Sequence, residues 1–391
     1  MRCLLPFWLT VLLAAGCSSI RTTERHTGPW NIAVLKQPPT AEWGGQTGLV
    51  QEVYYQGEPY RGKATRVFAY LGRPAAGKGP FPAIVLVHGG GGKAFRDWAE
   101  HWAKRGYIAL AMDTAGCGPN GPVPDGGPDQ SDATKFREFN DADVCDMWTY
   151  HAVSAVIRGV SLLAALPEVD RGSIGITGIS WGGYLTCIVA GLDDRLKVAV
   201  PVYGCGFLGD DSVWKATSLA KMSPEARDRW LRDFDPSQYL GGVNCPILFL
   251  NGSNDFAYPL DSYRASYRLV PAQFRHVSVV PNLPHGHIWT FDEADLFVDS
   301  VLRGGVPLPR LGQIHLDGDR VSVKVVARVP IKGAVLNYTN DTGEWQKRRW
   351  QTLPADLKGN TITVRLPGQR PVAWYISVTD ERGLRVSTEH E

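Results

Sequence analysis

The segment Gly-Ile-Ser-Trp-Gly-Gly at positions 178–183 limits what this chain can fold into more than any other. The apolar, β-branched run 173–177 before it predicts a buried strand, and apolar residues recur at helical spacing from 181 to 192. A strand that turns sharply into a helix strains its central residue, Ser180, and needs small residues at Gly178 and Gly182. Such a turn places the serine hydroxyl over a helix N-terminus, whose free N–H groups stabilise an oxyanion. Because G-x-S-x-G also occurs by chance, the prediction that Ser180 is a nucleophile depends on partners elsewhere in the chain.

The partners of a serine nucleophile are a histidine base and a carboxylate that orients it. Asp255 follows the predicted strand 246–250, although an Asp at this place is also a common turn former. His285 and His287 both follow the predicted strand 276–280. Each candidate thus comes just after the carboxyl end of a core strand, where ligand sites form in open α/β sheets. We favour His285, four residues after Pro281 and before a glycine, as the base; His287 is the alternative, and the other histidine is then structural or contacts substrate.

A glycine-rich segment follows the continuous apolar strand 81–87 and predicts half of an oxyanion hole. Without a Cβ, the backbone N–H groups of Gly90 and Gly91 can approach an ester oxygen closely. The N–H of Trp181, directly after Ser180, is the other expected donor. His88 begins this segment, and we interpret it as a hydrogen-bonded residue at the strand end.

Strands that alternate with helices predict a doubly wound, mostly parallel sheet for residues 31–305. Two antiparallel strands, 50–55 and 65–71, are expected to lead into it. A long Gly/Pro/Asp-rich loop at 114–132 and an insertion at 204–240 interrupt the alternation. A loop as long as 114–132 inside a compact domain is more often functional than accidental. Further strands are expected at 107–112 and 198–203, and helices at 95–102, 150–166, 260–270 and 291–303.

The composition changes at the Gly/Pro-rich segment 304–309. Beyond it, short alternating strands at 321–329, 334–338, 361–366 and 373–378 predict a small all-β sandwich over residues 306–391. Its aromatic residues suggest either a surface that stacks on sugar rings or ordinary packing, and packing is the commoner role. The residues concerned are Trp345, Trp350, Trp374 and Tyr375.

The N-terminus has the form of a signal peptide: Arg2, the apolar run 4–15, and small residues before Cys17. Small residues before a cysteine resemble a bacterial lipobox, which implies cleavage before Cys17 and lipidation of its thiol, with residues 18–30 as a tether. Ordinary secretion is the alternative, because Ala14 stands where a leucine is usual. We therefore expect export to the bacterial cell envelope, periplasmic or at the outer membrane, with membrane contact only through the lipid.

The net charge of +2 gives no reason to expect a nucleic-acid partner. An odd number of cysteines follows Cys17, so at least one thiol stays free or pairs between chains. Cys117 and Cys145, both in irregular segments after a core strand, are a weak candidate for a disulfide. No cysteine or histidine spacing predicts a zinc site.

Four segments in this order, 87–91, 178–183, 251–255 and 284–287, resemble the α/β-hydrolase superfamily, and the resemblance covers about residues 60–305. Within it, the chain is most similar to the branch of acetyl xylan esterases, dienelactone hydrolases and prolyl-oligopeptidase-like enzymes. The serine at 180 argues against true dienelactone hydrolases, which use cysteine. The lack of a β-propeller-sized N-terminal region makes a peptidase less favoured.

The resemblance implies a serine carboxylesterase without metal or organic cofactor. The expected substrate is a small ester or an acylated, chiefly acetylated, polysaccharide. The alternatives are an exported prolyl-oligopeptidase-like peptidase and a catalytically idle hydrolase fold that serves as a surface binding module.

Overall fold

The computed structural model describes residues 26–368 and 371–391. The expected signal peptide, the lipidation at Cys17 and most of the tether lie outside these residues. None of the helices in this described part combines the length and the apolar character of a membrane-spanning segment.

The described residues build a nine-stranded sheet in the order β1-β2-β3-β5-β4-β8-β9-β10-β11. The first three strands join by antiparallel pairing, and the six from β5 to β11 pair in parallel. The parallel strands are nearly continuous apolar runs, as expected where helices cover both faces of a sheet. The strands are β1 (Ala41–Thr47), β2 (Val50–Gln56), β3 (Arg66–Gly72), β4 (Phe81–Val87), β5 (Ile108–Met112), β8 (Val169–Ile179), β9 (Leu196–Val202), β10 (Ile247–Gly252) and β11 (Arg275–Val280).

Helices follow the parallel strands, as the alternating pattern predicted. Helices α2 (Arg96–Lys104) and α8 (Asp292–Leu302) lie together through a contact of His101 with Asp295. Helices α4 (Trp148–Ala165) and α5 (Trp181–Leu192) pack on each other and on the central strands. Helix α7 (Leu260–Leu269) links β10 to β11, and α1 is a single turn, Ile32–Leu35.

The chain reverses its direction of travel across the sheet at β4. From β4 it goes to β5 on one side, and the next core strand, β8, lies on the other side of β4. The carboxyl ends of β4 and β8 therefore meet at a topological switch point, where open α/β sheets bind ligands. The glycine-rich segment and Ser180 follow these two ends.

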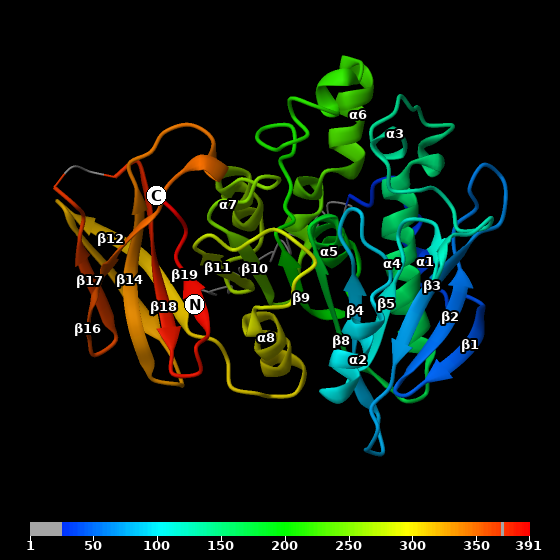
Figure 1. Cartoon of the computed structure of the whole chain (residues 1–391), viewed down its shortest axis with the longest axis horizontal. Coiled ribbons are helices and arrows are strands. Elements are labelled where there is room, and N and C mark those ends of the chain that lie inside the picture. The colour runs from blue at the N-terminus through cyan, green and yellow to red at the C-terminus, as the bar shows by residue number, and fades with distance from the viewer. Residues whose placement is uncertain (1–25, 369–370) are drawn as a thin grey trace, which may run out of the picture.

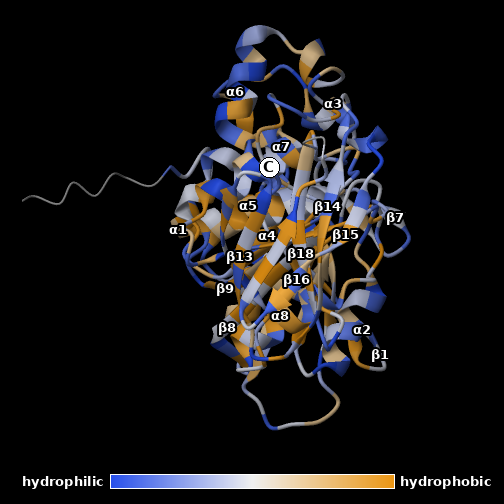
Figure 2. Cartoon of the chain, turned by 90° about the vertical axis from the view of Figure 1, so that its left-hand side faces the viewer, coloured by the Kyte–Doolittle hydropathy of each residue, from blue (hydrophilic) through white to orange (hydrophobic). Residues whose placement is uncertain are grey.

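The stretch that directly follows the predicted loop 114–132 packs on the predicted insertion 204–240. The loop contains the small hairpin of β6 (Cys117–Gly118) and β7 (Gly121–Pro122) and runs into the turn α3 (Asp132–Lys135), and the insertion contains α6 (Pro224–Phe234). The indole of Trp230 donates to Lys135 O at 2.8 Å, and Glu138 accepts from both the N–H and the hydroxyl of Ser223. Figures 1 and 2 show α3 and α6 together at the top of the molecule, with α6 mainly hydrophilic.

Beyond α8, the described residues form two four-stranded antiparallel sheets, which Figure 1 shows at the left. Apolar side chains such as Val323, Ile362, Leu336 and Ile376 are buried in them, as in a β-sandwich. One sheet has the order β12-β13-β17-β16 and the other β15-β14-β18-β19. Their strands are β12 (Arg310–Asp317), β13 (Arg320–Val326), β14 (Ile331–Thr339), β15 (Gln351–Pro354), β16 (Asp356–Lys358), β17 (Thr361–Arg365), β18 (Ala373–Asp380) and β19 (Arg385–Ser387).

The aromatic residues of these sheets support the packing interpretation. Trp345, Trp374 and Tyr375 are buried, and Trp350 packs its ring on Tyr375 at 5.1 Å. The three buried rings offer no face for stacking on a sugar, and Trp350 is half-buried.

Strands β1 and β12 were not predicted from the sequence. Both are edge strands with bulges and mostly exposed side chains, so they lack the alternation of apolar and polar residues that marks a half-buried strand. The suggested disulfide is wrong: Cys117 and Cys145 are both free thiols. The Cys117 sulfur faces Ala115 O within its own turn, whereas Cys145 is exposed.

Candidate active site

Ser180 occupies the junction between β8 and α5 with φ 58° and ψ −117°. A left-handed φ in a residue with a Cβ costs on the order of 1–3 kcal/mol and persists only where its surroundings hold it. Two backbone hydrogen bonds do so: Ser180 N donates to Val202 O at 2.9 Å, and Tyr184 N donates to Ser180 O at 2.9 Å. The hydroxyl therefore projects from the sheet at the N-terminus of α5.

The glycines beside Ser180 are required by close backbone packing. A Cβ on Gly178 would lie 2.3 Å from Gly182 O, and one on Gly182 would lie 2.0 Å from Val87 O. The backbones of β8, α5 and β4 thus pass each other at distances that only glycine permits.

Ser180, His285 and Asp255 form one hydrogen-bonded chain. His285 Nε2 lies 2.8 Å from Ser180 Oγ, and His285 Nδ1 lies 2.6 Å from Asp255 Oδ2. The other carboxylate oxygen of Asp255 accepts from the N–H groups of Ala257 at 2.9 Å and Tyr258 at 2.7 Å. The Asp255 carboxylate is fully buried, and 13% of the His285 side chain is exposed.

The imidazole of His285 is packed among aromatic rings that the sequence analysis did not identify. Tyr203 stacks on it with ring centroids 4.4 Å apart, and its hydroxyl donates to Pro284 O at 2.8 Å. Phe256 lies 4.9 Å from the same ring and is 49% exposed. Phe256 follows Asp255 directly, and Tyr203 directly follows β9, the strand after the Ser180 turn. An aromatic residue that follows the carboxyl end of a strand next to the Ser180 turn was the signal in the sequence that could have identified Tyr203.

His287 points away from this hydrogen-bonded chain. Its Nε2 accepts from Gly89 N at 3.0 Å, and its ring packs on Phe95 at 5.0 Å. Burial, aided by the nearby His88, lowers the pKa of His287, which keeps its ring in the neutral form that accepts this bond. His287 thus ties the loop that carries His285 to the glycine-rich segment.

The glycine-rich segment approaches Ser180 through Gly89 and Gly90. A Cβ on Gly89 would lie 2.8 Å from the Ser180 Cβ, and one on Gly90 would lie 2.9 Å from the Trp181 ring. A Cβ on Gly91 would meet no atom within 4 Å among the described residues, so Gly91 borders open space. The N–H of Gly89 is bonded to His287, so the N–H groups of Gly90 and Gly91 remain the candidate donors beside that of Trp181.

His88 is a structural residue at the strand end, as expected. It is almost completely buried, and its Nε2 accepts from Thr114 N at 2.9 Å.

Trp181, directly after Ser180, has a buried indole ring that packs among other aromatic residues. Trp214 packs on it at 4.5 Å and on Tyr258 at 5.2 Å. The ammonium group of Lys135 lies 4.6 Å from the centre of the Trp181 ring, and burial lowers its pKa, partly opposed by Asp132. The insertion and the α3 segment therefore each contribute a residue that contacts the Trp181 ring.

A cleft of about 770 Å³ lies elsewhere, at the amino end of β11 and beside β12 and β19. Its lining includes Arg275, Arg310 and Glu389, and it contains none of the site residues expected from the sequence. The hydrogen-bonded chain of Ser180, His285 and Asp255 lies outside this cleft.

The sheet order and the serine turn between β8 and α5 define the fold as an α/β-hydrolase. Two solved structures share it. An acetyl xylan esterase from Paenibacillus sp. R4 superposes with a TM-score of 0.56 at 21% identity over 70% of this chain and 92% of that one. Acetyl Xylan Esterase 1 from Thermoanaerobacterium sp. JW/SL YS485 gives 0.53 at 19% identity over 71% and 96%.

The chain belongs to the acetyl xylan esterase family, whose model matches residues 40–239, just over half of its 391 residues. Residues 215–345 also match the model of the PhoPQ-activated pathogenicity-related protein family. Among curated relatives, acetyl esterase Axe7A from Xylanibacter ruminicola is 23% identical over 59% of this chain. A protein named putative carboxymethylenebutenolidase from Salmonella typhimurium is 26% identical over 57% of this chain and 73% of its own. This chain spans about half, 54%, of the length of Axe7A.

Proposed function

We propose that the protein is a serine carboxylesterase that removes acetyl or similar small acyl groups, with Ser180 as nucleophile, His285 as base and Asp255 as the residue that orients it. The observation that carries the proposal is the unbroken chain from Ser180 Oγ through both nitrogens of His285 to Asp255, with distances of 2.8 and 2.6 Å. These distances lie within hydrogen-bond reach without substrate, as general-base activation of serine requires. Membership of the acetyl xylan esterase family supports the same chemistry.

The proposed reaction has two acyl-transfer steps. Ser180 Oγ attacks the ester carbonyl carbon while His285 Nε2 takes its proton, and the oxyanion receives hydrogen bonds from the N–H groups of Trp181 and Gly90. The intermediate then collapses to the acyl-enzyme and expels the alcohol. The leaving alcohol takes the proton from His285. Water attacks the acyl-enzyme by the same route in reverse, which releases the carboxylic acid and restores Ser180.

The positions of the aromatic residues suggest which part of the ester lies on which side. His285 must give its proton to the leaving alcohol, so the exposed ring of Phe256 beside it lies on the alcohol side. The N–H of Trp181 is a proposed oxyanion donor, so we place the acyl group on the side of Trp181 and its neighbour Trp214. Bulky, mostly buried rings there favour a short acyl chain, and a half-exposed aromatic ring suits the apolar face of a sugar. We therefore propose acetylated carbohydrate as the substrate class.

The test is hydrolysis of p-nitrophenyl acetate, longer acyl esters, acetylated xylan and a peptide anilide by the wild-type chain and its variants. Ser180→Ala and His285→Ala are expected to lower kcat by several orders of magnitude, whereas His287→Ala should lower it about tenfold by loosening Gly89. Ester turnover that persists in Ser180→Ala would refute the serine mechanism. Preference for the anilide would identify a peptidase instead, and no turnover of any substrate would favour the idle hydrolase fold.

Export with a lipid on Cys17 remains part of the proposal, on the basis of the sequence alone. Mass spectrometry of the N-terminal peptide from cell envelopes tests it. A lipidated peptide that starts at Cys17 is expected, and an unmodified peptide cleaved elsewhere would indicate ordinary secretion.

A further inference from the structure

Asn254, directly before Asp255, and Asp261, six residues after it, both bind the same turn of the C-terminal sheets. The side-chain amide of Asn254 donates to Arg348 O at 2.6 Å and lies 3.3 Å from Trp345 O. On the other flank, Asp261 Oδ2 accepts from the indole N–H of Trp345 at 3.0 Å. The turn concerned, Trp345–Lys347, is a single 3-10 turn that Figure 1 shows in orange beside α7.

The hydrogen bonds of Asn254 continue into the loop that carries His285. Asn254 Oδ1 accepts from the Ser253 hydroxyl at 2.6 Å, and the same hydroxyl oxygen accepts from Asn282 N at 3.1 Å. Asn282 has a left-handed φ of 55° and opens the His285 loop. One route of hydrogen bonds thus connects the Trp345 turn with both the Asp255 loop and the His285 loop.

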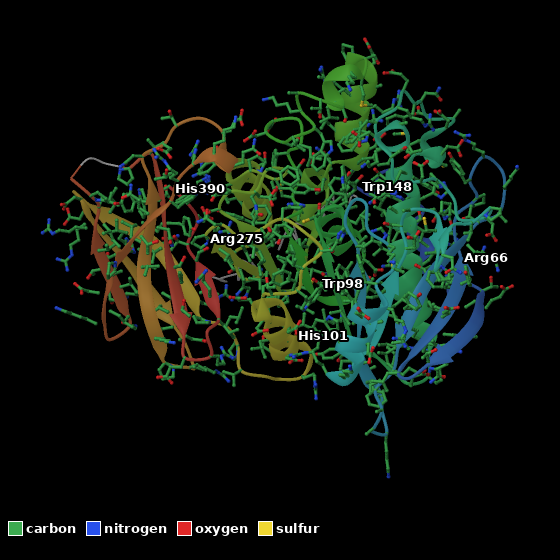
Figure 3. All side chains as sticks on the ribbon, viewed as in Figure 1. Arg66, Trp98, His101, Trp148, Arg275 and His390 are labelled. Carbon is green, nitrogen blue, oxygen red and sulfur yellow. The ribbon has the colours of Figure 1, made fainter. Side chains whose placement is uncertain are left out.

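A second set of contacts holds the same turn against α7. His390 Nε2 lies 3.1 Å from Asp261 Oδ1, and Arg264 donates to His390 O at 2.8 Å. The bond from His390 is the main cause that lowers the pKa of Asp261 to about 2. Figure 3 shows His390 where the C-terminal sheets meet the rest of the molecule, and both His390 and Trp345 are buried. The junction is therefore a packed contact with defined partners.

The Asp255 loop needs such support because of its place in the sheet. It leaves β10, which is next to the edge strand β11, and surface loops are the most mobile parts of a fold. An orienting carboxylate must nevertheless be held within about 0.5 Å of its productive position. The two N–H bonds within the loop fix the carboxylate relative to its own turn. Contacts with the Trp345 turn add to the bonds that tie this loop to the sheet, such as Ser253 N to Val280 O at 3.0 Å.

We infer that the C-terminal sheets position the catalytic acid, with Asn254 and Trp345 as the positioning residues. This inference rests on the proposed function, since it assigns Asp255 the orienting role. It gives the C-terminal sheets a task in catalysis without any contact with substrate.

The experiment uses the full chain with three single changes. Asn254→Ala removes the donor. Asn254→Asp keeps the shape but turns a carboxylate oxygen toward the carbonyl of Arg348. Ser278→Ala is the matched control, because its hydroxyl donates to Arg385 O at 2.9 Å across the same junction but away from both loops. For each variant, kcat and KM for p-nitrophenyl acetate, the melting temperature and the rate of Ser180 labelling by a fluorophosphonate are measured.

We expect Asn254→Ala to lower kcat and the labelling rate by about 10²-fold with little change in KM, the cost of misplacing a catalytic group by about 1 Å. Asn254→Asp should lower kcat further than Asn254→Ala does. The kcat of Ser278→Ala should stay within about twofold of wild type, even if its melting temperature falls as much as that of Asn254→Ala. Equal losses in Asn254→Ala and Ser278→Ala, or an unchanged kcat in Asn254→Ala, would overturn the inference. A wild-type chain with no Ser180-dependent turnover would instead overturn the proposed function.

Discussion

The exchange of Asp255 for asparagine tests the proposed mechanism most directly, because the structure dictates how the new side chain must lie. Asp255 Oδ1 accepts two backbone N–H groups, from Ala257 at 2.9 Å and Tyr258 at 2.7 Å. In the Asp255→Asn variant only the amide oxygen can accept them, so it must take the Oδ1 position. The NH₂ group then faces His285 Nδ1, where Asp255 Oδ2 lies at 2.6 Å in the wild type.

This orientation forces the wrong tautomer on His285. An NH₂ group donates and cannot accept, so Nδ1 must lose its hydrogen and the neutral ring carries it on Nε2. Nε2–H faces Ser180 Oγ and cannot take its proton. In a serine protease triad the same exchange lowers kcat by about 10⁴-fold, which corresponds to about 5 kcal/mol of transition-state stabilisation. The folded state should lose only about 1–2 kcal/mol, because the two backbone bonds remain and lose only their charge assistance.

Steady-state hydrolysis of p-nitrophenyl acetate and thermal unfolding of the same samples measure both effects. Asp255→Asn is expected to be folded, with a melting temperature within several degrees of wild type, and to have about 10⁻⁴ of the wild-type kcat. A loss below tenfold in a folded variant would show that Asp255 does not orient the base.

Three further predictions concern packing, acyl specificity and pH. Gly182→Ala places a Cβ 2.0 Å from Val87 O. Thermal unfolding should therefore show that the free energy of unfolding falls by about 3 kcal/mol or more, or that the variant does not fold. Trp214→Ala removes a ring 4.5 Å from that of Trp181, and the ratio of kcat/KM for butanoate over acetate esters should rise about tenfold or more. Burial, with help from nearby Arg310, lowers the pKa of His276 to about 4, below its unfolded value of about 6.5. The folded state then binds fewer protons, so stability is retained above pH 6.5 and decreases as the pH falls toward 4. Urea unfolding should show that this group lowers the free energy of unfolding by about 2 kcal/mol at pH 5 relative to neutral pH. The His276→Gln variant should lack this part of the pH dependence.

The sequence by itself determined the parallel sheet, the turn at Ser180 and the identity of the acid and base candidates. These features are local: apolar runs such as β4, helical spacing after Ser180, and glycines between them all act over a few residues. The order of the strands along the chain then places Ser180, Asp255 and the two histidines at one edge of the sheet.

Tertiary structure decided what depends on residues far apart in the chain. His285 reaches Ser180, whereas His287 reaches Gly89. Both histidines belong to one loop, so the direction of each side chain, which the sequence pattern does not specify, distinguishes their contacts. The edge strand β1 became a strand because β2 pairs with it, not because its own pattern favours one. The contact of Asn254 with the Trp345 turn has no local signal, since an asparagine in a turn and a tryptophan about ninety positions later are both ordinary on their own. Folding brings them together because the C-terminal sheets pack against α7 and β11, and we infer that this packing supports the position of Asp255.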